Sequence, residues 1–217
     1  MVAVFLGIIG LCIGSFVCAT VWRLHEQSVL AGKKVLSSAD KTYEKDLSIS
    51  KGRSMCGQCK HPLASRDLVP LFSWLWLRGR CRYCKQPIGI LEPLTEASTA
   101  ILFVLSYVYW PMPWNGQGTF DFVVWLVLLA GFVALCIYDL KWLLLPDKIV
   151  LPLTLLTIVK LVVDVTVFHA GLGSILSAAW GALIIGGLFY GLFAASGGRW
   201  IGGGDVKIAV MLGLLAG

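Results

Sequence analysis

Five long apolar stretches constrain the fold of this chain more than any other feature. Each is close to the ~20 residues that a helix needs to cross the ~30 Å hydrocarbon core of a membrane. They are Val2–Trp22, Pro93–Trp110, Phe122–Tyr138, Ile149–Phe168 and Ser174–Ala195. A sixth begins at Val206 and stops at Gly217, from which we expect that the natural chain continues further. With 58% hydrophobic and 14% charged residues, the composition excludes an ordinary soluble domain, in which ~25% of residues are charged. It predicts an all-α polytopic membrane protein.

Basic residues gather on one side of the predicted spans. Of 18 Lys and Arg residues, 13 fall between Arg23 and Lys85, and strict alternation of the spans puts four more on the same side. The positive-inside rule makes this side cytoplasmic. The net charge of +6 is therefore explained by sidedness and gives no reason to expect a nucleic-acid partner. We expect three parts: residues 1–22 as the first span, 23–92 as a cytoplasmic loop, and 93–217 as a membrane core that is incomplete at its C-terminus.

Four of the seven cysteines form two Cys-x-x-Cys pairs in the predicted cytoplasmic loop, Cys56 with Cys59 and Cys81 with Cys84. Two such pairs at this separation are typical of a tetrahedral, zinc-ribbon-like site in which each pair supplies two thiolates. A cytoplasmic location disfavours structural disulfides, although a pair of redox-active dithiols is an alternative. Because sulfur would fill all four positions, the zinc would be structural and would close a loop too small to build its own core.

Other polar segments have roles that the pattern leaves open. An aromatic and basic run from Val69 to Arg82 either lies at the membrane surface, with its arginines toward lipid headgroups, or contacts an acidic ligand or a partner. Glu96, in the first turn of the second span, either complements the helix N-terminus or faces a polar cavity. Lys160 and Asp164 are spaced i,i+4 in the fourth span, and we expect them to pair or to snorkel.

Three carboxylates lie at the ends of predicted spans on the basic side: Asp139, Asp147 and Asp205. Ionisable groups at membrane depth are costly, which makes each a candidate functional residue. Two carboxylates close together resist ionising together, so that one can activate water while the other protonates a leaving amine. The glycines in Gly202-Gly-Gly-Asp-Val-Lys207 permit the close backbone approach that docking of an extended substrate requires. The residue pattern alone favours plainer roles, in which Asp205 starts a helix and Asp147 is a cap or turn residue.

Taken together, these motifs resemble those of the type IV prepilin peptidases, a family of bifunctional leader peptidases and N-methyltransferases. The resemblance extends from Gly14 to Gly217, except for an insert from Glu26 to Ser50. Val17 and Cys18 stand where the family usually has Leu-Asn. Besides both Cys-x-x-Cys pairs, the resemblance rests on Gly14-Ser-Phe16, Trp22-Arg-Leu24, Pro70-Leu-Phe-Ser-Trp-Leu75, Arg78-Gly-Arg-Cys-Arg82, Pro93 with Glu96, Asp139-Leu, Leu145-Pro-Asp147 and Gly202-Gly-Gly-Asp-Val-Lys207.

The resemblance implies that Asp139 and Asp205 are the catalytic pair of a GxGD-type intramembrane aspartic protease. Supporting roles are assigned to Asp147, Gly202, Gly204 and Lys207. It also implies removal of a short basic leader from prepilins or pseudopilins at the cytoplasmic face of a bacterial inner membrane. Many members then methylate the new N-terminus with S-adenosylmethionine, an activity linked to the cytoplasmic loop. A transporter or ion pathway is the alternative function, because intramembrane carboxylates and a glycine-interrupted span are also transporter features. A zinc-stabilised membrane scaffold is a third.

Overall fold

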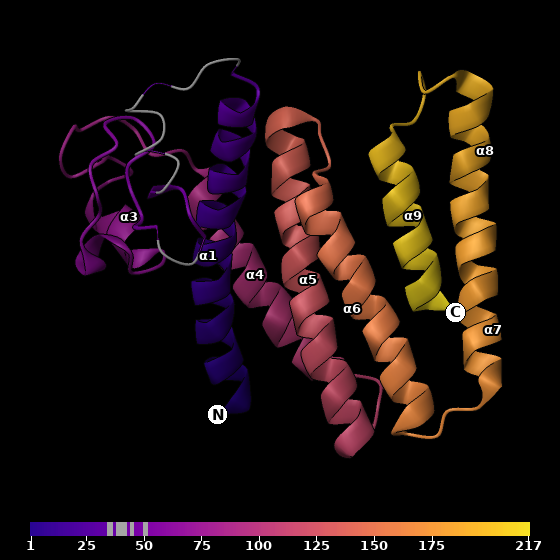
Figure 1. Cartoon of the computed structure of the whole chain (residues 1–217). Coiled ribbons are helices and arrows are strands. Elements are labelled where there is room, and N and C mark those ends of the chain that lie inside the picture. The colour runs from indigo at the N-terminus through magenta and orange to yellow at the C-terminus, as the bar shows by residue number, and fades with distance from the viewer. Residues whose placement is uncertain (34–36, 38–42, 44–45, 50–51) are drawn as a thin grey trace. The chain divides into compact units, whose positions relative to one another are not determined.

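The computed structural model describes residues 1–33, 37, 43, 46–49 and 52–217, and in these residues the only regular elements are helices (Figure 1). The α-helices are α1 (Val2–Ala31), α3 (Phe72–Trp76), α4 (Leu91–Val108), α5 (Gly116–Trp142), α6 (Asp147–Thr166), α7 (Leu172–Gly181), α8 (Gly187–Ser196) and α9 (Gly203–Ala216). A 3₁₀ turn (Ser65–Asp67) and a π-helical turn (Ala182–Gly186) are also present. The prediction of an all-α chain is confirmed. The chain forms two compact units, unit 1 (Met1–Tyr109) and unit 2 (Trp110–Gly217).

Helices long and apolar enough to cross a membrane occur at all five predicted positions, with α7, the π-helical turn and α8 forming one continuous span. Their ends differ most in α1, which continues past Trp22 to Ala31. Its 30 residues correspond to about 45 Å at the helical rise per residue, which is longer than the ~30 Å hydrocarbon core. The last turns of α1 therefore belong to the predicted polar loop. Much of the predicted insert from Glu26 to Ser50 lies outside the described residues.

Unit 1 is built on a close crossing of α1 and α4. A side chain at Gly10 would place its Cβ 2.6 Å from the Cα of Ala100, and one at Gly14 would lie 2.7 Å from the Cα of Glu96. Two non-bonded carbon atoms cannot approach so closely without a clash, so these glycines let the two backbones touch. Lipid gives no hydrophobic driving force between helices, and small residues at such positions let van der Waals packing replace it.

The C-terminal turns of α1 hold the cysteine segment, by which we mean the described residues 46–49 and 52–90 between α1 and α4. Arg23 is buried and donates hydrogen bonds to the backbone oxygens of Ser48, Ile49 and Gly52, at 3.1–3.3 Å. One turn later, Gln27 donates to the oxygen of Leu47. The guanidinium donates hydrogen bonds to three carbonyl oxygens, and these bonds offset the cost of burying its charge. The cysteine segment is thus attached to a membrane helix by side chains of that helix.

Unit 2 is an up-and-down bundle in which α6 packs against both α5 and α9 (Figure 1). Its core is an apolar cluster contributed by these three helices: Val124, Leu128, Leu135, Val150, Leu153 and Met211. Helix α9 also meets α7 through glycines, because a Cβ at Gly213 would lie 2.4 Å from the oxygen of Gly181. Tight packing of the later turns of α9 therefore fixes the position of the whole helix, including its first turn.

A buried charge cluster crosses between α5 and α6. The Nζ of Lys160 lies 2.6 Å from Asp164, one turn along α6, and 2.9 Å from Asp121 of α5. Both carboxylates are buried. The predicted pairing of Lys160 with Asp164 is confirmed, and Asp121 is a further partner that sequence analysis missed. In apolar surroundings the positive charge of the Lys160 ammonium compensates the negative charges of the two carboxylates. Burial of either carboxylate without that ammonium would be costly in free energy.

The α1–α4 crossing predicts that Gly10→Ala destabilises the chain, because its added methyl group has no space beside Ala100. Overpacking of this kind costs about 1–3 kcal/mol of unfolding free energy, to be measured as a lower midpoint of unfolding in detergent. Gly7→Ala is the matched control on the same helix, since its Cβ would meet only Val104 Cγ2 at 3.5 Å, an ordinary contact. Equal midpoints for the two variants would contradict the inferred packing.

Candidate functional site

The four cysteines of the predicted metal site come together in unit 1. All four sulfurs of Cys56, Cys59, Cys81 and Cys84 lie within 4.8 Å of one another, and those of Cys56 and Cys84 are 3.9 Å apart. A tetrahedral site with ~2.3 Å metal–sulfur bonds needs sulfurs separated by about 3.8 Å. The cluster therefore has the donors and the spacing to hold a metal ion.

Two matching turns present these thiols. In the first, the N–H of Cys56 donates to the oxygen of His61 and the N–H of Lys60 to that of Cys56. The second repeats both bonds at positions 81, 85 and 86, and each turn begins with an isolated antiparallel bridge to a proline. Lys60 and Lys85 both have positive φ, 56° and 60°. The repeat is visible in the sequence as Cys-x-x-Cys-Lys-x-Pro, a signal that the analysis of the cysteine pairs missed.

The thiols of the cluster differ in acidity. Burial opposes ionisation of Cys56, but hydrogen bonds from the backbone N–H groups of Cys59 and Gln58 and from neighbouring thiols outweigh it and lower the pKa of Cys56 to about 7. For Cys84, the backbone hydrogen bond from Gln86 favours the thiolate, yet desolvation and the other three thiols raise its pKa to about 11. The first thiolate forms readily, and its negative charge suppresses ionisation of the next thiol. A bound cation removes this conflict, because metal ligation deprotonates all four.

Glu96 holds the aromatic segment rather than its own helix end. It is buried on α4, and one of its carboxylate oxygens accepts a hydrogen bond of 2.7 Å from the backbone N–H of Leu71. Leu71 has a φ of 59° and directly precedes α3. The bond therefore fixes a turn of positive φ, after which Phe72 and Trp76 project to the surface, 68% and 84% exposed. This exposure suits either predicted role of the aromatic run, a membrane surface or a partner contact.

Three helix ends place the predicted carboxylates at one end of unit 2 (Figure 1). Helix α5 ends at Trp142 and is capped by Leu143, whose left-handed conformation (φ 53°) lets its N–H donate to the oxygen of Asp139 at 2.7 Å. Asp147 begins α6, and Asp205 lies in the first turn of α9. Asp205 accepts a hydrogen bond from the N–H of Gly202 at 2.9 Å through one oxygen, Oδ2. It thus caps its own helix with that oxygen.

Two contacts tie the start of α9 to the link between α5 and α6. Lys207 and Asp147 form an exposed ion pair of 2.5 Å. A Cβ at Gly204 would lie 2.7 Å from the Cβ of Leu145, whereas a Cβ at Gly203 would meet nothing within 4 Å. Of the glycines in this motif, Gly204 is therefore the one that packing requires, and Gly202 contributes its N–H to Asp205.

The structure does not join the two predicted catalytic carboxylates directly. Asp139 is exposed and Asp205 is half-buried. Within the described residues no hydrogen bond links them, and α6 packs between their two helices. A shared water molecule or a substrate would have to connect them. Their action as a pair stays a prediction.

Comparisons with known proteins match both units. Residues 8–110 match the family described as the bacterial Peptidase A24 N-terminal domain, and residues 126–217 match the type IV leader peptidase family. Proteins named prepilin leader peptidase/N-methyltransferase are similar over most of the chain. The one from Aeromonas salmonicida strain A449 is 32% identical over 94% of this chain and 69% of its own length.

The corresponding protein of Pectobacterium carotovorum is 29% identical over 96% of this chain and 72% of its own length. That of Aeromonas hydrophila is 35% identical over 74% of this chain and 53% of its own length. The chain thus spans between about half and three quarters of the relatives that it matches. No solved structure matches it.

The contact of Gly204 predicts that Gly204→Ala separates α9 from the α5–α6 link, because its methyl group would overlap Leu145. We expect a loss of about 1–3 kcal/mol in unfolding free energy, measured by denaturant or thermal unfolding in detergent. Gly203→Ala, one residue away with open space for its Cβ, should unfold like the unchanged chain. If Gly203→Ala were as destabilising as Gly204→Ala, backbone freedom and not packing would explain the glycines.

Proposed function

Because the chain belongs to the type IV leader peptidase family, we propose that it is a membrane-embedded aspartic endopeptidase that removes the leader from type IV prepilins or pseudopilins. The observation that carries the proposal is the end of unit 2 where Asp139, Asp147 and Asp205 emerge together. There the Gly-Gly-Gly-Asp turn packs on the link that follows Asp139, through Gly204 and Leu145. The family match covers this unit from residue 126 to 217.

In the proposed reaction, one of Asp139 and Asp205 acts as the general base and the other as the general acid of peptide hydrolysis. An ionised carboxylate takes a proton from water, whose oxygen attacks the scissile carbonyl carbon. A protonated carboxylate gives its proton to the leaving nitrogen as the carbon–nitrogen bond breaks. The exposure of Asp139 and the half-buried position of Asp205 give water and an extended peptide access to both groups. No covalent intermediate is needed.

The supporting residues position this end of the bundle. The ion pair of Lys207 with Asp147 spans from α9 to α6 and keeps the first turn of α9 beside the α5–α6 link. Gly204 permits the close approach, and the N–H of Gly202 orients Asp205 through one oxygen. The other oxygen, Oδ1, has no hydrogen bond within the described part of the chain, so it can face a substrate. An ion pair this exposed stabilises little, so its role is positional.

We place this end at the cytoplasmic face of a bacterial inner membrane. Lys141, Lys148, Arg199 and Lys207 lie at the same end of unit 2 as the three carboxylates. The opposite links, 111–115 and 167–171, carry no Lys or Arg. Positively charged loops stay in the cytoplasm. A prepilin would therefore meet the site with its basic leader on that side and its apolar helix in the membrane.

We further propose that the cysteine cluster binds a structural zinc ion and that the chain N-methylates the new N-terminus. Four thiolates leave no open coordination position for substrate, which favours a structural role. The metal would tie together two turns that share no strand or helix. S-adenosylmethionine, when bound, would supply the methyl group. The similar proteins are named prepilin leader peptidase/N-methyltransferase, which supports this second activity.

The catalytic proposal predicts that Asp139→Asn and Asp205→Asn each reduce leader removal by at least ~10²–10⁴-fold, since each amide abolishes one proton transfer. The measurement is the size shift of a prepilin co-expressed with each variant. Gly203→Ala is the control, because it alters the same turn without touching a carboxylate or a packed contact. Normal processing by either asparagine variant, with the protein inserted and folded, would refute the assignment.

The metal proposal predicts about one zinc ion per chain when the purified protein is analysed by elemental spectrometry. Cys81→Ser should bring the zinc content close to zero, because Cys81 is a buried member of the cluster. Cys136→Ser removes an exposed thiol of α5 outside the cluster and should keep the metal. Unchanged zinc in Cys81→Ser, or none in the unchanged chain, would argue against the site.

A further inference from the structure

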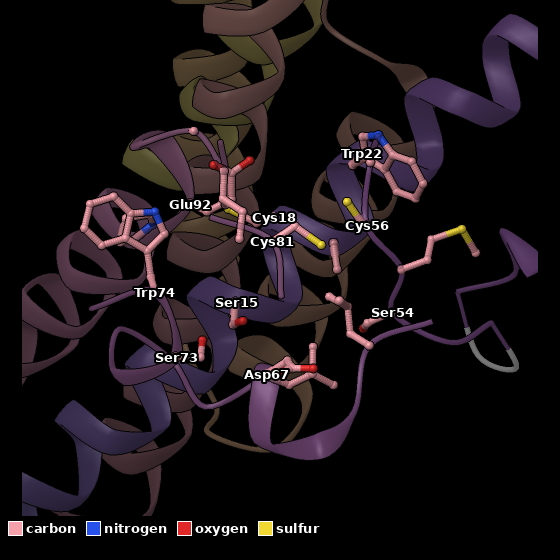
Figure 2. Close-up of a pocket in the computed structure, with 18 of the residues that line it drawn as sticks. Ser15, Cys18, Trp22, Ser54, Cys56, Asp67, Ser73, Trp74, Cys81 and Glu92 are labelled. Atoms are coloured by element: carbon pink, nitrogen blue, oxygen red, sulfur yellow. The ribbon is translucent and has the colours of Figure 1, made fainter. Parts of the chain in front are cut away.

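Helix α3 has an inner face and an outer face. Ser73 and Trp74 are among the residues that line a cavity inside unit 1 (Figure 2). Phe72, Leu75 and Trp76 have the i, i+3 and i+4 spacing of a single helix face, and all three are exposed, Leu75 by 64%. We call these three side chains the outer face of α3. Large apolar side chains that gather in the open mark a surface that something else covers.

The start of α3 is held at a level inside the apolar part of α1. The N–H of Leu71, directly before α3, donates to the carboxylate of Glu96 at 2.7 Å. Glu96 packs beside Gly14 of α1, where a Cβ would lie 2.7 Å from the Cα of Glu96. Gly14 precedes Trp22, the last residue of the apolar stretch, by a length of helix of about 12 Å. Helix α3 therefore begins at the depth of the membrane boundary and not out in the water.

The turn after α3 is tied to the start of α4. The N–H of Ile88 donates to the oxygen of Gly79 at 2.7 Å. Helix α4 has 18 residues, which correspond to about 27 Å, so nearly its whole length is needed to cross the ~30 Å hydrocarbon core. Its first turn must then lie at the membrane boundary, where Ile90 and Leu94 are exposed as well. Both ends of α3 are thus held at the level where unit 1 meets the membrane surface.

Two free arginines follow the outer face. Arg78 and Arg80 are exposed, and within the described residues their guanidinium groups form no hydrogen bond or ion pair with another side chain. Arg82, by contrast, is occupied by Asp67 at 2.7 Å. A guanidinium matches the oxygens of a phosphate group with two parallel hydrogen bonds. Apolar and aromatic side chains followed by arginines are typical of a helix that lies in the membrane interface.

We propose that α3 is a membrane-interface anchor, with its outer face among the upper acyl chains of the phospholipids and Arg78 and Arg80 against their phosphates. The depth of α3 favours lipid over a soluble partner, because such a partner cannot reach below the headgroups. The anchor would hold the cysteine segment on the bilayer from a second side, in addition to the bonds from Arg23 of α1. The inference goes beyond the proposed peptidase and does not depend on it.

Tryptophan fluorescence of the whole chain in phosphatidylethanolamine–phosphatidylglycerol vesicles tests the proposal. The emission that is lost in Trp76→Phe belongs to Trp76. Lipids brominated on the upper acyl chain should quench this emission, whereas acrylamide in the water should barely reach it. Quenching by acrylamide and not by the brominated lipids would overturn the proposal. So would protection of Trp76 that appears only when a prepilin is added, which would make the outer face of α3 a substrate contact.

Polar substitution of the outer face should release it from the lipid. In a chain that carries both Phe72→Gln and Leu75→Gln, the equilibrium between docked and free α3 should shift by at least about tenfold, because two apolar side chains no longer leave water. The shift is measured as a gain of Trp76 quenching by acrylamide. Ile49→Gln is the control, an exposed apolar residue of the same segment that lies outside α3. Equal quenching in the double variant and the control would contradict the anchor.

The phosphate contacts have their own test in the same vesicles. Arg78→Gln together with Arg80→Gln should also raise acrylamide quenching of Trp76, since each arginine at a phospholipid surface strengthens association about fivefold. Arg53→Gln removes an exposed arginine of the same segment and should leave the quenching unchanged. If the double variant behaved like Arg53→Gln, the phosphate contacts would be overturned. Unfolding midpoints close to that of the unchanged chain verify that every variant is folded, as expected for side chains that lie in the open.

Discussion

The absence of water in the hydrocarbon core governs this structure, because every backbone N–H and C=O there must be satisfied within its own segment. Among the described residues, non-helical backbone is therefore confined to helix ends, to the links between helices and to the segment between α1 and α4. The non-glycine residues with positive φ follow this rule: among the described residues they are Lys60, Leu71, Arg78, Lys85, Leu143 and His169. Chemistry that needs exposed backbone or converging side chains can be built only at these places. The three carboxylates of unit 2 and the thiols of unit 1 are both found there.

Features that depend on composition and spacing were predictable. The five spans follow from apolar length, and the metal cluster follows from the spacing of its cysteines. The pairing of Lys160 with Asp164 follows from the helical repeat. The extension of α1 beyond Trp22 was not predicted, because hydropathy falls at Arg23 although the residues after it are good helix formers. Hydropathy predicts only the part of a helix that lies in the membrane, whereas the helix itself can continue into the polar loop.

Features that depend on tertiary contacts were not predictable. The bond from Leu71 to Glu96 joins residues 25 apart, and Asp121 reaches Lys160 from another helix. The sequence places Glu96 in the first turn of a span but does not say which donor meets it, and it gives no sign that Asp121 is buried. The same limit applies to Asp139 and Asp205, whose separation is set by how α6 packs between α5 and α9. Side-chain pairing across helices is decided by packing, which one sequence does not display.

The glycines of the two units allow different close contacts. In unit 2, Gly204 brings a carboxylate-bearing turn against Leu145, so its missing side chain serves the geometry of the proposed peptidase. In unit 1, Gly79 leaves space for the indole of Trp74, whose buried N–H has no hydrogen-bond partner among the described residues. Cys18 of α1 and Trp74 both line a cavity in this unit, and at position 18 the family usually has an asparagine. A thiol lacks the strong donor and acceptor of an amide. The side chain at position 18 therefore cannot offer the strong hydrogen bonds that an asparagine would offer there.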